Sequence, residues 1–192
     1  MKLAIAIALV TAMSTTQIER AQQVARSRDS ERTLFHRKYL FDLPGDTVTQ
    51  IEVITEFRRL VLVTEDHLRV GDQMFSRGVR EAEAAMAPTR GILTLKAHVR
   101  FNPLNTYVGI PPLRLALGTT VTEPLAELDT EVTGQFSLPY KDRRGKNATV
   151  LTGAVLQADV PASSIGQTTR QVAVVLTGKE LARTSVDFAR FD

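Results

Sequence analysis

The amino-acid sequence predicts an α+β protein, in which N-terminal amphipathic helices are followed by an antiparallel β-sandwich-like region. Two observations support this prediction. Before residue 90 the apolar residues recur with the helical period, and after it they alternate with polar residues as in half-buried strands. The chain has 192 residues, enough for one domain with a proper core. An immunoglobulin-like arrangement is one form of such a sandwich, although the cysteines and tryptophan typical of that fold are absent.

The chain begins with a short apolar run of the kind found in secretory signals. Lys2 precedes the run from Leu3 to Ala12, and Ala12-Met13-Ser14 has the small-x-small pattern of a cleavage site. We expect residues 1–17 to be a signal peptide cleaved near Ser14, which would make the protein periplasmic or secreted. The apolar run is too short to leave a transmembrane span in the mature chain. The alternative is that these residues begin a cytosolic helix or strand of a cytoplasmic protein.

Residues 18–45 form a polar segment that we interpret as an N-terminal arm. Between residues 18 and 38 it carries six basic and three acidic residues, a pattern that allows a patch facing phosphate or lipid headgroups. The charge signs alternate along the segment and weaken any such field. A solvated helix is therefore favoured over a nucleic-acid interface. The turn Leu43-Pro44-Gly45-Asp46 interrupts the chain after the arm.

Residues 46–71 are expected to form one long amphipathic helix. Thr49 and Glu52 have the spacing of a capping box, and Gly71 is a natural stop. A shorter helix is expected between Ser76 and Pro88. The helical segment 46–90 would bury its stripe against the sheet, so that residues 46–192 form one globular unit. The stripe consists of Val53, Ile54, Phe57, Leu60, Val61 and Leu68, with Thr64 in the remaining gap.

Residues 91–192 are rich in strand patterns. Alternation predicts a strand over 93–101, and residues 131–159 read as a hairpin with a polar tip. Pro111-Pro112 favours an edge or a loop over a central strand in that part of the chain. Residues 171–177 are apolar on both faces and predict a central buried strand, which Gly178 turns into a last strand over 181–191.

Composition excludes several kinds of chemistry. The chain has no cysteine, which removes disulfides, thiolate catalysis and cysteine-ligated metals. Its formal net charge of +3 is too small to predict strong electrostatic binding to nucleic acid. His36, His67 and His98 lack a paired metal-binding spacing, and Glu65 and Asp66 would point apart on a helix. We therefore predict no catalytic residue, no metal ligand and no cofactor.

Two segments are candidates for binding a partner, which we expect to be another protein. The stretch from Phe101 to Leu113 combines aromatic residues with prolines and has almost no charge, so it would lose little entropy on binding. The polar tip of the hairpin is basic and would suit an acidic partner. A strand edge is a third contact surface, while the oligomeric state stays open. The candidate residues are Phe101, Leu104, Asn105, Tyr107, Ile110, Arg143, Arg144 and Lys146.

These observations favour an exported, non-enzymatic binding or structural protein of the bacterial envelope or exterior. Two alternatives belong to other classes. One is a hydrolase or metal-dependent enzyme, which would need Glu65, Asp66 or Asp72 to converge with a histidine. The other is a cytosolic regulatory or nucleic-acid-binding protein that uses the basic arm. No motif in the chain ties it to one family.

Overall fold

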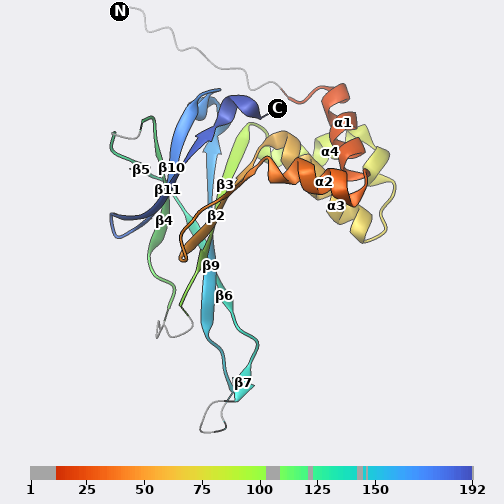
Figure 1. The fold of residues 1–192 in the computed structure, drawn as a ribbon. Helices are drawn as coiled ribbons and strands as arrows, with labels where there is room; N and C mark the ends of the chain where they lie inside the picture. Colours follow the sequence, from red (N-terminus) through yellow and green to blue (C-terminus); the bar gives the residue numbers. More distant parts are fainter. Residues whose placement is uncertain (1–11, 103–108, 121–122, 142–144, 146, 192) are drawn as a thin grey trace, which may run out of the picture.

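The computed structural model describes residues 12–102, 109–120, 123–141, 145 and 147–191. Two antiparallel sheets form a sandwich, and a bundle of helices, the helical lobe, stands beside one end of it (Figure 1). The fold is therefore α+β and sandwich-like, as the sequence predicts. The helices of the lobe are α1 (Thr15–Ala25), α2 (Asp29–Arg37), α3 (Glu56–Arg69) and α4 (Val79–Met86), with 3-10 turns at Phe75–Arg77 and Ala87–Thr89.

The larger sheet, sheet A, has the strand order β1-β2-β3-β9-β6. Neighbouring strands are antiparallel throughout. The predicted hairpin of residues 131–159 is confirmed, because β6 pairs with β9 from Glu131 opposite Gln157 to Phe136 opposite Leu151. The strands of sheet A are β1 (Leu40–Asp42), β2 (Val48–Ile54), β3 (Ile92–Arg100), β6 (Glu131–Phe136) and β9 (Leu151–Pro161).

The smaller sheet, sheet B, has the strand order β11-β10-β4-β5. The apolar run of residues 171–177 lies in β10, which is an inner strand as expected. Its turn into β11 contains Thr177 and Gly178, both with positive φ angles. The strands are β4 (Leu113–Gly118), β5 (Ala126–Glu127), β10 (Thr169–Leu176) and β11 (Lys179–Asp187), followed by a 3-10 turn at Phe188–Arg190; a small pair, β7 (Tyr140–Lys141) and β8 (Asn147–Ala148), lies near the hairpin tip, and α5 (Ala162–Ile165) follows β9.

The two sheets enclose the larger hydrophobic core. Leu95 and Leu156 from sheet A and Leu115 and Val172 from sheet B are fully buried within it. The proline pair before β4 precedes an inner strand, so the expectation of an edge or loop holds only for the residues before Leu113. Proline cannot donate a ladder hydrogen bond, and both prolines of the pair lie before β4 begins.

The prediction of one long helix over residues 46–71 is wrong for the first half of this range. Residues 48–54 form strand β2, and the helix begins only at Glu56, with the Thr55 side chain accepting a hydrogen bond from the Arg58 amide at 3.2 Å. Thr49 is not a cap, because its hydroxyl donates to the His98 carbonyl. The stretch is rich in β-branched residues, and pairing with β1 and β3 outweighs the helical periodicity.

The prediction that the apolar face of this helix packs against the sheet is wrong, because in the structure the apolar face of α3 packs against other helices. Phe57, Leu60 and Val61 form a second hydrophobic core with Ile18 and Ala21 of α1. The supposed polar arm therefore contributes a buried helix face to the lobe. Ser14 and Gln17 form a capping box at the start of α1. Cleavage after Ser14 would remove this cap, at a cost of about 1 kcal/mol.

Two arginines of α3 join the lobe to sheet A. Arg59 donates to the carbonyls of Thr89 and Ile92 at 3.1 and 3.2 Å, and to the Thr94 hydroxyl. Arg58 donates to the Val53 carbonyl at 2.6 Å. These bonds fix the angle at which the lobe stands on the end of the sandwich.

Candidate functional site

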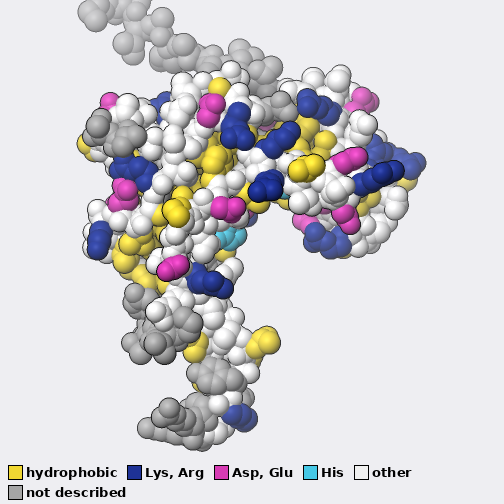
Figure 2. Space-filling model, in the orientation of Figure 1, with side chains coloured by type: hydrophobic (Ala, Val, Ile, Leu, Met, Phe, Trp, Pro, Cys, Tyr) yellow, Lys and Arg dark blue, Asp and Glu magenta, His cyan; other side chains and the backbone are white. Residues whose placement is uncertain are grey.

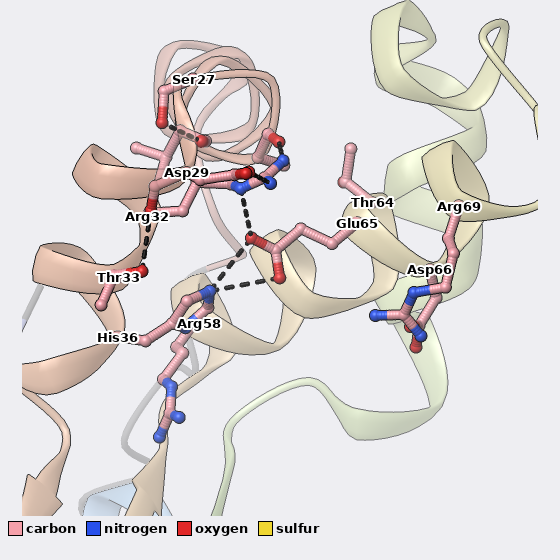
Figure 3. Close-up of polar contacts among 12 residues, drawn as sticks. Ser27, Asp29, Arg32, Thr33, His36, Arg58, Thr64, Glu65, Asp66 and Arg69 are labelled. Atoms are coloured by element: carbon pink, nitrogen blue, oxygen red, sulfur yellow. Dashed lines mark hydrogen bonds and ion pairs between the residues drawn. The ribbon is translucent and has the colours of Figure 1, made fainter.

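A cavity of about 490 Å³ lies between α2 and α3 and brings several charged side chains together. Arg32 and His36 are one helical turn apart on α2, so both face α3. Glu65 of α3 lies between them, as Figure 3 shows. The cavity is lined by Asp29, Arg32, Thr33, His36, Glu65, Leu68 and Arg69.

The polar atoms in this cavity are largely occupied by each other. His36 Nε2 lies 3.0 and 3.2 Å from the two Glu65 oxygens, and because an ionised carboxylate only accepts, Nε2 carries the proton. Arg32 Nε lies 3.7 Å from Glu65, while its other nitrogens donate to Asp29 and to the Ala25 carbonyl (Figure 3). His36 Nδ1 is buried and has no hydrogen-bond partner in the described part of the chain.

This arrangement suits a clamp between helices better than a catalytic pair. A general base needs a ring nitrogen within reach of substrate, whereas one nitrogen of His36 is engaged and the other is buried. The contacts of His36 and Arg32 with Glu65, together with the Phe35 ring beside Phe57, attach this helix to α3. Among the described residues, no group of three histidine, aspartate or glutamate side chains is placed to hold a metal ion.

The other histidines are held in separate pairs. His67 Nδ1 lies 2.9 Å from Asp72, and its ring stacks on Phe75 with the centroids 3.8 Å apart. The Phe75 amide, followed by His67, lowers the pKa of Asp72. These contacts fold the chain back after the end of α3. Asp66 instead pairs with Arg69 on the exposed surface. The structure therefore does not gather Glu65, Asp66 and Asp72 into one site.

A third group of charges lies where the lobe meets sheet A. The Arg58 side chain is 3% exposed, and its Nη2 lies 2.5 Å from Glu52. Its guanidinium also lies over the Tyr39 ring at 5.0 Å from the centroid. His98 Nε2 approaches the second Glu52 oxygen at 3.5 Å. Burial alone would raise the pKa of Glu52, but the hydrogen bond with His98 and the charges of Arg58 and Lys96 outweigh it, so the pKa is lowered.

The lowered pKa of Glu52 predicts acid sensitivity. A depressed carboxylate pKa contributes stability that is present above its usual value of 4.5 and is lost as the pH falls toward the folded-state pKa. We expect the free energy of unfolding of Glu52→Gln to be lower than that of the wild type at pH 7. The difference between the two free energies should become smaller below about pH 4.5. Urea unfolding at a series of pH values measures this. Glu83→Gln, at an exposed position on α4, is the control and should show no such narrowing.

The residues predicted to bind a partner are only partly placed. Phe101 is 7% exposed and packs in the sandwich core, so its ring is not available at the surface. Ile110 is 37% exposed. A Cβ added to Gly134 would lie 2.9 Å from Cδ1 of Ile110, so the Ile110 side chain lies directly over β6. Leu104, Asn105, Tyr107, Arg143, Arg144 and Lys146 lie outside the described residues.

Two exposed apolar residues on the same hairpin were missed by the sequence reading. Phe136 is 61% exposed and Leu138 is 87% exposed. They continue the alternating apolar row of Val132 and Gly134, which predicts burial. In the structure the β7 end of the hairpin projects beyond the body of the sandwich, and hydrophobic side chains are visible on this projection (Figures 1 and 2). We call Ile110, Gly134, Phe136 and Leu138 the hairpin patch.

The hairpin patch lies on a strand edge that is open in the described structure. β6 ends sheet A and pairs only with β9. The edge strand β11 of sheet B carries four charged residues, Lys179, Glu180, Arg183 and Asp187, which discourage pairing with another strand. The edge strands β1 and β5 have only three and two residues. β6 has a single charge, Glu131, and is thus the least protected edge.

Comparison with models of protein families and with curated proteins finds no match to this chain. A search of the helices in the described residues finds none with the length and apolar character needed to cross a membrane. The geometry of the individual sites is therefore the basis for an assignment of function.

Proposed function

We propose that this protein is a non-enzymatic binding protein that recognises another protein chain through the hairpin patch and the adjacent edge of β6. The observation that carries the proposal is the exposure of Phe136, at the end of an edge strand without basic residues, and of Leu138 two residues beyond it. Large exposed apolar side chains on an open edge mark a contact surface, because both the side chains and the backbone gain partners on binding.

One of the residues predicted from the sequence, Ile110, lies at the same surface. Ile110 belongs to the segment chosen for its prolines and aromatic residues, and its side chain lies over Gly134 of β6. Lys141 begins the basic tip of the hairpin, close along the chain to Leu138. An extended partner segment that is apolar, with acidic residues beside it, would satisfy both features.

Export to the bacterial envelope or exterior is the second half of the proposal. It is supported by the basic residue and apolar run at the start of the chain. The basic arm gives less support to the nucleic-acid alternative, since several of its cations have internal roles. Arg32 contacts Asp29 and Glu65, and Arg20 lies over the Phe57 ring at 5.7 Å.

Site-specific photo-cross-linking in the native cells tests the proposal. A cross-linking residue replaces Leu138 in one variant and Met74 in the other, because Met74 is 81% exposed on the helical lobe. We expect a defined protein adduct from position 138 only, recovered from the envelope or medium on a chain shortened to near Thr15. Phe136→Asp should abolish the adduct without changing the melting temperature, since the ring is mostly exposed.

Two results of this experiment would contradict parts of the proposal. Equal labelling from positions 74 and 138 would contradict the hairpin patch as the contact surface. Adducts confined to the cytosol and carried by the full-length chain would contradict export while leaving the binding surface in place.

A further inference from the structure

The hairpin patch lies on a strand whose flanks carry opposite charges. From Glu123 to Leu138 the chain has four acidic residues and no basic one, and the residues from Lys141 to Lys146 include four basic and one acidic. Asp129, Glu131 and Lys141 are exposed. Within the described part of the chain none of these three has an ion-pair partner. The edge of β6 is thus negative at its beginning and positive beyond its end.

An antiparallel pairing of this edge with itself matches the opposite charges of its two flanks. Two identical strands related by a twofold axis place the beginning of one against the end of the other, which brings opposite charges together at both ends. With the axis at Gln135, Gly134 faces Phe136 of the second copy, and Val132 faces Leu138. Asp129 and Lys141 are each six residues from Gln135, so they also face each other across the axis.

The side chains suit this register as well as the charges do. In an antiparallel pair, facing residues point to the same side of the sheet, so each Phe136 ring would pack against the Ile110 side chain that lies over Gly134 of the other copy. The apolar rings and the free backbone groups of both edges would be removed from water in one step.

We propose that the partner of the hairpin patch is a second copy of this chain, paired antiparallel through β6 so that sheet A continues across the dimer. This inference rests on the proposed function, because it names the partner of the same surface. The interface is isologous, so each substitution in it changes two symmetric contacts of the dimer.

Sedimentation equilibrium and light scattering on the full-length chain test the dimer. We expect a species of twice the single-chain mass of 21.2 kDa at high concentration. Phe136→Asp should weaken dimerisation by at least about a hundredfold, since it buries a charge at two symmetric positions. Leu34→Asp is the matched control, an exposed leucine on α2 that should leave the dimer unchanged. Equal melting temperatures of the variants verify that both are folded.

Charge reversal tests the register. Asp129→Lys and Lys141→Asp should each weaken the dimer by about tenfold, because each creates two like-charge pairs. The double variant restores opposite charges and should recover the wild-type affinity. Failure of the double variant to recover overturns the antiparallel register.

A wild-type chain that stays monomeric at all concentrations overturns the dimer itself. The proposed function is judged separately by the adduct from position 138. If that adduct contains a different protein while the chain is monomeric, the self-pairing is wrong and the binding surface stands. If no adduct forms either, both proposals fail.

Discussion

Replacement of Arg58 by alanine is expected to lower the free energy of unfolding by about 3–5 kcal/mol, as found when one partner of a buried ion pair is removed. Arg58 is 3% exposed and Glu52 is 15% exposed, so the carboxylate would be left without its nearest cation. The variant also removes the bond to the Val53 carbonyl and the contact with the Tyr39 ring. Urea unfolding at pH 7 measures the loss.

Two further variants identify the cause of this effect. Arg69→Ala, on the same helix, removes an exposed arginine paired with Asp66 and should cost less than about 1 kcal/mol. Adding Glu52→Gln to Arg58→Ala should recover part of the stability, because the unpaired buried charge disappears. A loss of under 1 kcal/mol for Arg58→Ala would mean that the pair does not hold the lobe to sheet A.

Replacement of Gly153 by alanine is expected to lower the free energy of unfolding by about 3 kcal/mol, at the upper end of the range for overpacking. An added Cβ would lie 2.4 Å from the Val99 carbonyl oxygen of the neighbouring strand and 3.1 Å from Gln135 Oε1. A backbone carbonyl inside a sheet cannot move aside without breaking its ladder. Thermal unfolding followed by circular dichroism measures the effect.

The position of Gly153 links this prediction to the proposed contact surface. The register of β9 with β6 shifts between Gln135 and Phe136, where the hairpin leaves the body of the sheet. Gly153→Ala should therefore also weaken self-association, because the displacement of β9 would shift β6 away from β6 of the second copy. Gly109→Ala is the control, since nothing lies within 4 Å of its added Cβ. Equal stability of both variants would contradict the close approach of β9 to β3.

The sequence predicted the regular elements of the second half well. Alternation between apolar and polar residues identified β3 and the β6–β9 hairpin, because a strand with one buried face leaves that pattern. A continuous apolar run identified β10, which is buried on both faces. The sequence also identified α4 and the stop before Gly71, where α3 ends at Arg69. It could not separate β2 from α3, since Val53 and Ile54 fit both a strand and the helical stripe until pairing with β3 decides between them.

Which surfaces are exposed was decided by the tertiary structure alone. Val132 and Phe136 have the same alternating pattern, but Val132 packs against the sandwich core while Phe136 is 61% exposed. Phe101 was predicted to face a partner, whereas the structure buries it between the sheets. Periodicity specifies which residues share a face of an element. Only the lengths and positions of the neighbouring elements specify whether that face is covered, and these depend on contacts between residues far apart in the chain.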